Sequence, residues 1–126
     1  MSIFGRDYDT KDGTCIRDYI HIEDLASAHL AVLDYLNSND SDIFNVGYGH
    51  GFSVLEVIDT AKKISGVDFE VIDAPRRLGD PAVLIADSSK LRNLTSWKPK
   101  KDNLETIIAL KNALIQAFTG SVLIIL

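Results

Sequence analysis

One segment near the middle of the chain carries the signals that begin, sustain and end an amphipathic helix. Ser53 and Glu56 have the spacing of a capping box, in which each side chain satisfies a backbone N–H at the start of the helix. Gly66 suits the left-handed conformation that ends many helices. Apolar runs at residues 43–46 and 69–72 flank the segment and predict strands, so the chain should be α/β. The apolar stripe of the helix is Val54, Val57, Ile58 and Ala61.

The chain before this segment shows the same alternation of strand and helix. Residues 2–4 predict a strand, and residues 5–14 a polar loop with an Asp-Gly turn. Residues 18–22 alternate polar and apolar side chains, which predicts a second strand. Acidic Glu23 and Asp24 then suit the start of a helix. Its predicted stripe is Leu25, Ala28, Val32, Leu33 and Leu36.

The chain after the central helix continues the pattern. Pro75 ends the preceding strand, and residues 76–81 have loop composition. A short helix should follow residues 87–89 and end before Trp97. Asp102 and Glu105 again have capping spacing, ahead of the longest predicted helix. The stripe of that helix is Leu104, Ile107, Ile108, Leu114, Ile115 and Phe118.

Charge and composition exclude several classes of function. A formal net charge of -5 repels phosphate backbones, so we expect no binding to nucleic acid. A single cysteine, Cys15, cannot form an internal disulfide, and the three histidines lack zinc-ligand spacing. The N-terminus has no signal-peptide pattern, and the apolar run at residues 122–126 is too short to span a bilayer. We therefore expect a cytoplasmic protein that does not associate with membranes.

A glycine loop follows the strand predicted at residues 43–46. Glycines at positions 47, 49 and 51 precede a helix, where backbone N–H groups can bind phosphate. A dinucleotide fingerprint needs its third glycine at position 52, where Phe52 stands instead. We therefore favour a structural turn over a dinucleotide site. Tyr48 and His50 on this loop could touch a ligand or could be solvated turn residues.

A second loop combines positive charge with glycine and a carboxylate. Arg76 and Arg77, together with Arg17 far upstream, can pair bidentately with phosphate, while Asp80 can accept hydrogen bonds from ribose hydroxyls. This combination suits a nucleoside diphosphate. The equally weighted alternative is that Arg76 and Arg77 are solvated, or pair with Asp73 and Asp80. Nucleophilic catalysis has little support, because Cys15, the serines and the histidines at 21 and 29 lack identifiable partners.

Four segments of the sequence, taken in order, form a recognisable series. They are Ile3 to Thr14, Arg17 to Ala26, Asn45 to Val57, and Arg76 to Asp80 with Ala86-Asp87 and Leu94 to Trp97. These segments resemble the UDP-glucose 4-epimerases, which are extended short-chain dehydrogenases/reductases. The resemblance covers nearly all of residues 2–118, and dehydratases and decarboxylases of nucleotide sugars remain the alternative relatives.

The resemblance implies a fold and a set of contacts. The fold would be α/β, the C-terminal substrate-binding part of such an enzyme, with residues 43–46 as a strand that joins a Rossmann sheet absent from this chain. Arg17 and Arg77 would contact the diphosphate of a UDP-sugar, and Asp80 the uridine ribose. Leu84 falls where side-chain size affects whether N-acetylated sugars fit. Residues 1–120 would be the nucleotide-sugar-binding region, and residues 121–126 an atypical apolar tail.

The catalytic features of that family are not found in the sequence. Its members use NAD and a Tyr-x-x-x-Lys pair, but here no tyrosine is followed by lysine four positions later and no NAD fingerprint occurs. We expect no catalytic residue, no bound NAD, and weak UDP-sugar binding by a truncated chain that is inactive alone. An uncovered strand edge and apolar helix face would favour self-association. The alternative is a non-catalytic module, or half of a split enzyme, that docks on a separate NAD-binding chain.

Overall fold

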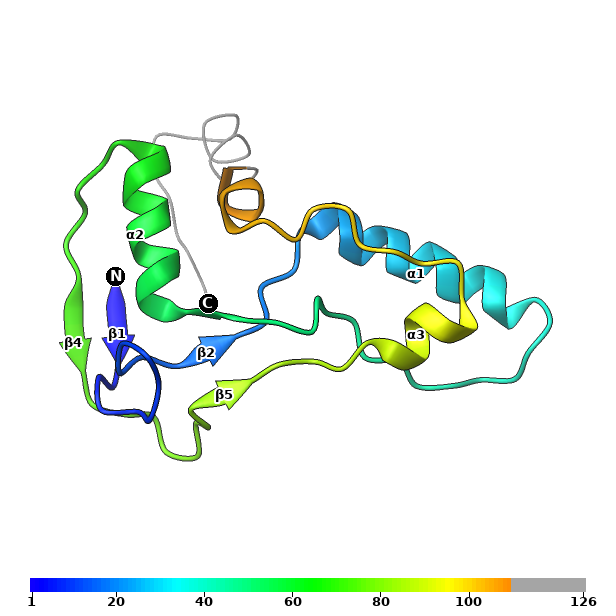
Figure 1. Cartoon of the computed structure of the whole chain (residues 1–126), viewed down its shortest axis with the longest axis horizontal. Helices are drawn as coiled ribbons and strands as arrows, with labels where there is room; N and C mark the ends of the chain where they lie inside the picture. Colours follow the sequence, from blue (N-terminus) through cyan, green and yellow to red (C-terminus); the bar gives the residue numbers. More distant parts are fainter. Residues whose placement is uncertain (110–126) are drawn as a thin grey trace.

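A computed structural model describes residues 1–109 of the chain. Figure 1 shows an elongated arrangement, with α2, β1 and β4 at one end, α1 and α3 at the other, and β2 and β5 between them. The elements are β1 (Ser2–Phe4), β2 (Ile16–Arg17), α1 (Ile22–Leu36), β3 (Phe52–Ser53), α2 (Val54–Ser65), β4 (Ile72–Ala74), β5 (Val83–Leu84) and α3 (Ser89–Leu94). Residues 104–109 are also helical.

The strands form two small sheets that hold distant parts of the chain together. In one, β1 pairs in parallel with β4, so that Phe4 lies opposite Ala74. In the other, β2 lies between antiparallel β3 and parallel β5. Arg17 on β2 therefore lies opposite both Phe52 and Leu84. The central strand fixes where the Arg17 backbone sits relative to the two neighbouring strands, β3 and β5.

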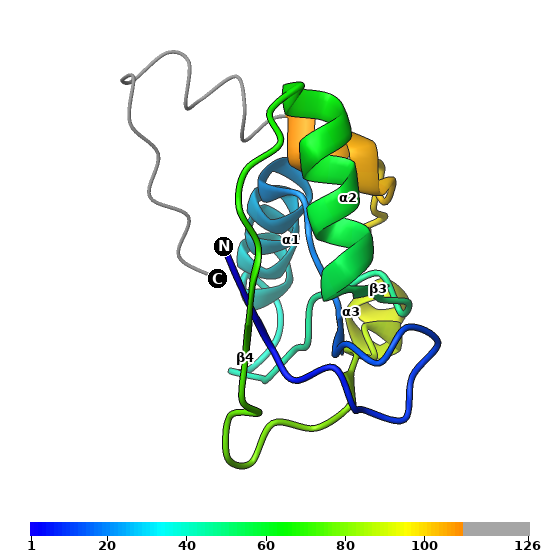
Figure 2. The same ribbon diagram turned by 90° about the vertical axis from the view of Figure 1, so that its left-hand side faces the viewer.

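Helix α2 follows its sequence signals closely. The Ser53 side chain accepts a hydrogen bond from the Glu56 backbone, the Glu56 side chain accepts one from the Ser53 backbone, and Gly66 ends the helix with φ of 68°. Val57 and Ile58 are its buried residues. The loop at residues 5–14 and strand β4 lie on opposite sides of the N-terminal end of α2 (Figure 2). The Asp12 carboxylate anchors that loop by accepting hydrogen bonds from the hydroxyls of Ser53 and Thr14.

Helix α1 begins earlier than the alternating pattern predicted. Residues 18–21 form no strand, because Ile22 already belongs to the helix and His21 is its N-cap, accepting from the Glu23 backbone. The predicted helical face is only partly right. Ala28 is fully buried, whereas Leu33 remains 60% exposed. The buried residues of the helix are Asp24, Ala28 and Ala31.

The main core joins α1 to α3 and the segment after it. Leu91 and Trp97 pack on Ala28 and Ala31 of α1. The Trp97 indole also donates hydrogen bonds to the Asp24 carbonyl at 3.1 Å and the Ser27 hydroxyl at 3.0 Å. A buried indole with its N–H satisfied thus joins α1 to the segment that follows α3. The partly buried side chains around this core are Ile20, Val32, Phe44 and Val46.

Three further sequence predictions differ from the structure. Residues 43–46 join no hydrogen-bonded ladder, and Ile43 is 84% exposed, because no described strand lies alongside this segment. Strand β4 spans residues 72–74 instead of 69–72, since its pairing with β1 sets its position. The helix at residues 104–109 is capped by Asn103, whose side chain accepts from the Thr106 backbone. Glu105 instead pairs with Lys63 at 2.7 Å.

Some predictions concern residues outside the described part of the chain. Leu114, Ile115 and Phe118 of the predicted long stripe lie there, as do the residues 121–126 predicted to form an apolar tail. Within residues 1–109, no helix has the length and apolar character needed to cross a bilayer.

Candidate functional site

A cavity of about 290 Å³ opens where β1, β2, the start of α2 and the loop at residues 76–81 meet. Arg17, Arg77 and Asp80 all line it, although they come from distant positions in the sequence. The other lining residues are Ser2, Ile3, Phe4, Gly5, Thr14, Cys15, Tyr19 and Val54. Two guanidinium groups, one carboxylate and an apolar wall therefore share one concave site.

Arg17 is held by its strand and by a carboxylate across the cavity. Its Nη1 donates to the Ile16 carbonyl at 2.8 Å, and its Nη2 lies 3.5 Å from Oδ1 of Asp80. The Arg17 side chain is 22% exposed and that of Asp80 is 33% exposed. Partial burial reduces solvent screening, so these two charges act on each other and on anything that enters the cavity.

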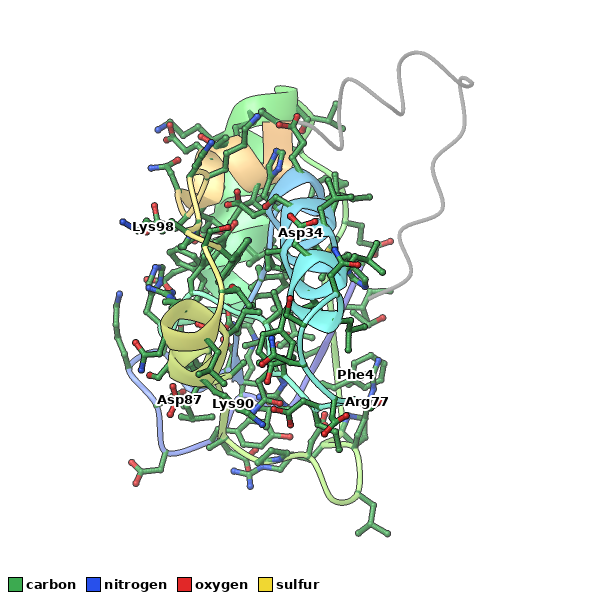
Figure 3. The ribbon with its side chains drawn as sticks, turned by 90° about the vertical axis from the view of Figure 1, so that its right-hand side faces the viewer. Phe4, Asp34, Arg77, Asp87, Lys90 and Lys98 are labelled. Atoms are coloured by element: carbon green, nitrogen blue, oxygen red, sulfur yellow. The ribbon has the colours of Figure 1, made fainter. Side chains whose placement is uncertain are left out.

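Arg77 reaches the cavity because its loop turns sharply. Gly79 has φ of 84°, a left-handed conformation that favours glycine, and the Asp80 N–H donates to the Arg77 carbonyl at 3.3 Å. The Arg77 guanidinium lies 3.8 Å from the centre of the Phe4 ring, and Figure 3 shows the two side chains next to each other. This cation–π contact places a positive charge at the apolar end of the site.

Arg76 serves a different purpose from its neighbour Arg77. Its Nε donates to Oδ1 of Asp7 at 2.6 Å, and its guanidinium lies 4.0 Å from the centre of the Tyr8 ring. It does not line the cavity. The ion-pair interpretation therefore holds for Arg76, but its partner is Asp7 and not Asp73, which pairs with Arg6 at 2.5 Å.

Leu84 stands apart from the other three predicted site residues. It lies on β5 directly opposite Arg17 but is 59% exposed and does not line the cavity. Its role in sugar specificity stays a prediction.

Sequence reasoning missed the aromatic and apolar wall of the site. Phe4 and Ile3 belong to β1, and Tyr19 follows β2. Burial raises the pKa of the Tyr19 hydroxyl, which keeps it protonated and able to donate. Tyr19 could have been found, since residues two apart in an extended chain share a face and Arg17 was already identified. Phe4 could not, because only the tertiary fold brings Arg77 onto it.

The glycine loop fits a tightly packed turn and does not fit an NAD cradle. A Cβ on Gly47 would lie 2.2 Å from Oδ2 of Asp18, and one on Gly51 would lie 2.8 Å from the Arg17 carbonyl. The Asp18 carboxylate accepts from the Tyr48 N–H at 3.3 Å, so a negative charge already holds the turn. That carboxylate would repel a pyrophosphate.

Tyr48 and His21 belong to a hydrogen-bond network that supports the fold. Tyr48 is 6% exposed, so it is not the solvent-facing turn residue or ligand contact considered from the sequence. Its hydroxyl accepts from the His21 N–H at 3.0 Å and donates to Asp24 at 2.8 Å. His50 is exposed and lies 3.8 Å from the Asp102 carboxylate. Among residues 1–109, no three metal-ligating side chains gather in one place.

Comparison with known proteins gives consistent matches. The model of the NAD dependent epimerase/dehydratase family matches residues 2–47. The UDP-glucose 4-epimerase of Lactobacillus helveticus is 50% identical over 110 residues, which cover 86% of this chain and 33% of that protein. The enzyme of Streptococcus mutans is also 50% identical, again with 86% and 33% covered.

Solved structures agree with the sequence relatives. The UDP-Glc/GlcNAc 4-epimerase of Campylobacter jejuni matches with a TM-score of 0.79 and 70% identity, covering 86% of this chain and 33% of that one. The UDP-glucose 4-epimerase of Bifidobacterium longum, solved in complex with NAD⁺ and UDP, matches with a TM-score of 0.78 and 42% identity, covering 86% and 32%.

The described residues thus form an α/β part of the extended short-chain dehydrogenase/reductase epimerase fold. The chain is a homologue of the UDP-glucose 4-epimerases of the NAD dependent epimerase/dehydratase family. It spans about a third of the length of the curated relatives that it matches.

Proposed function

We propose that this chain binds the nucleotide end of a UDP-sugar in the cavity between β1, β2 and the loop at residues 76–81. The observation that supports this most is the convergence of Arg17, Arg77 and Asp80 on one cavity. The guanidinium groups of Arg17 and Arg77 bind the diphosphate, since a planar guanidinium matches phosphate oxygens. Asp80 accepts hydrogen bonds from the ribose hydroxyls.

The size and lining of the cavity support a partial site. At about 290 Å³ it lies at the lower end of the usual range for ligand pockets, so it holds part of a nucleotide sugar while the rest extends outward. Its apolar wall suits a base, and its guanidinium groups suit a diphosphate. We expect weak binding for this reason.

The chain contributes binding and not turnover in this proposal. The full-length relatives act as epimerases and their family is described as NAD dependent, but Tyr8, Tyr19, Tyr35 and Tyr48 all lack the lysine of a Tyr-x-x-x-Lys pair. When bound, NAD supplies hydride transfer. The residues of this chain would only hold and orient the substrate.

Isothermal titration calorimetry with UDP and with UDP-glucose tests the proposal. Arg17→Ala and Arg77→Ala should each weaken binding about tenfold or more, because each removes charge-assisted hydrogen bonds to phosphate. Arg76→Ala is the matched control, since this arginine lies outside the cavity and pairs with Asp7. A wild-type chain that gives no heat at millimolar ligand would contradict the proposal.

Sugar specificity can be tested with the same assay. The relative from Campylobacter jejuni is described as acting on both UDP-Glc and UDP-GlcNAc, and it is 70% identical to this chain. We propose that the chain accepts N-acetylated sugars as well, with Leu84 near the sugar. Leu84→Tyr should then weaken binding of UDP-GlcNAc more than that of UDP-glucose, and equal effects on both would argue against this role.

A second candidate function rests on the uncovered face of α1. Ile22, Leu30 and Leu33 of this helix are 60%, 65% and 60% exposed. Leu33 also lines a groove of about 310 Å³, whose other lining residues are mainly apolar residues of α1 and of residues 42–46. Because exposed apolar faces of this kind mark interaction surfaces, we propose that this face docks on a separate NAD-binding chain.

Co-expression with an NAD-binding domain of a related epimerase tests the second candidate. Formation of a complex, with epimerase activity only in the mixture, would support it. In the absence of such a chain, we expect the same face to pair two copies of this protein. Elution as a monomer that ignores the added domain would contradict both expectations.

A further inference from the structure

The two guanidinium groups of the cavity, those of Arg17 and Arg77, have different partners. Among the described residues that line it, only Asp80 carries a carboxylate, and this carboxylate faces Arg17 at 3.5 Å. Arg77 forms no ion pair with any residue from 1 to 109 and rests on the Phe4 ring instead. One guanidinium of the site is therefore partly neutralised, and the other is available to an anion.

This arrangement affects small anions and nucleotides differently. A phosphate that approaches Arg17 must come close to the Asp80 carboxylate, and like charges at such distances repel. An inorganic phosphate offers at most a P–OH donor of its own charged group, so that donor can reach the carboxylate only by bringing the negative charge close to it. A nucleoside diphosphate differs, because its ribose hydroxyls can donate hydrogen bonds to the same carboxylate.

We infer that Asp80 makes the cavity selective for nucleoside diphosphates over inorganic phosphates by holding a carboxylate against the guanidinium of Arg17. The inference rests on the proposed function and adds a selectivity mechanism to it. Asp80 disfavours anions that lack neutral hydroxyl donors set apart from the phosphate charge. Its partial burial makes the repulsion stronger than at an open surface.

Calorimetry on the whole chain with three ligands tests the inference. The ligands are UDP, a UDP analogue without ribose hydroxyls, and inorganic pyrophosphate. Wild-type protein should bind UDP about tenfold more tightly than the analogue, because hydrogen bonds to a charged group are lost. Asp80→Asn should remove most of that difference and should tighten pyrophosphate binding about fivefold, as expected for one partly exposed charge.

Matched variants separate the local effect from a change in net charge. Asp73→Asn removes the same charge from another arginine–aspartate pair, Arg6–Asp73, whose residues do not line the cavity, and should leave all three affinities unchanged. Asp80→Ser serves as a second, smaller replacement and should behave like Asp80→Asn. Thermal melts of each variant show that the fold is kept.

The outcomes distinguish this inference from the proposed function. If UDP binds to the wild type but Asp80→Asn binds pyrophosphate no more tightly, the selectivity mechanism is wrong and the nucleotide site stands. If both Asp80→Asn and Asp73→Asn tighten pyrophosphate binding equally, net charge explains the effect and the inference also fails. If the wild type does not bind UDP, the proposed function and the inference fall together.

Discussion

The Tyr48 hydroxyl donates a 2.8 Å hydrogen bond to the Asp24 carboxylate, joining the turn before β3 to the first turn of α1. The same carboxylate accepts from the backbone N–H groups of Lys100 and Lys101, at 3.1 Å and 2.8 Å. Three separate segments therefore meet on one buried side chain. Breaking this network should destabilise the part of the fold in which Trp97 packs on α1.

Tyr48→Phe removes the hydroxyl and leaves Asp24 and the His21 N–H each without one partner. We expect the free energy of unfolding to fall by about 1–3 kcal/mol, the cost of leaving a buried polar group unsatisfied. Urea denaturation of the wild type and the variant measures this difference in the free energy of unfolding. Tyr35→Phe is the matched control, because no described residue hydrogen-bonds the Tyr35 hydroxyl, and an equal loss in both variants would contradict the prediction.

Stability should decline in acid because of Asp24. Burial alone would raise its pKa, but hydrogen bonds from Tyr48 and from the backbone of Lys101 and Lys100 outweigh burial and lower the pKa. A carboxyl whose folded-state pKa is lowered contributes stability above its unfolded pKa and loses it as pH falls through the folded pKa. The free energy of unfolding should therefore drop below about pH 4.

Urea unfolding of Asp24→Asn between neutral and acidic pH measures this contribution. The variant should be less stable at neutral pH and should lose less stability in acid than the wild type. Asp59→Asn, on the exposed side of α2, should keep the full acid dependence. If the free energy of unfolding falls with pH in the same way in wild type and in Asp24→Asn, the Asp24 carboxyl does not contribute to the loss of stability in acid.

Ser53→Ala should weaken the start of α2. The hydroxyl accepts from the Glu56 N–H at 3.0 Å and donates to the Asp12 carboxylate at 2.5 Å, so it stabilises both the helix and the loop before β2. We expect a loss of about 1–2 kcal/mol in the free energy of unfolding. Ser65→Ala, at the exposed end of the same helix, should cost much less, and equal losses in both would rule out a special role for the cap.

Leu33→Glu should reduce association through the exposed face of α1. This side chain is 60% exposed and lines the groove beside α1, and a charge there opposes burial against an apolar partner. Size-exclusion chromatography with light scattering should show a shift toward monomer. Leu78→Glu, at a fully exposed loop tip far in sequence from α1, should leave the oligomeric state unchanged.

Local signals were enough to predict helix α2. A capping box, a stripe of apolar residues and a terminal glycine act within a few residues of each other, and each stabilises the same helix. The sequence also predicted one binding site made of Arg17, Arg77 and Asp80, from the chemistry of these residues and from the resemblance of their segments to the epimerases. The structure places all three on one cavity, while their contacts with a ligand stay a prediction.

Contacts between distant segments decided the rest. Arg76 and Arg77 are identical in chemistry, yet Arg76 pairs with Asp7 while Arg77 turns into the cavity, because β1 and β4 place different partners beside each one. Residues 43–46 have the composition of a strand but form no ladder, since strand formation needs a neighbouring backbone that local sequence does not specify. Sequence by itself determined which groups this protein can use. Only the tertiary structure decided which of them face the cavity and which hold the fold, because that choice depends on charges and rings brought together from separate strands.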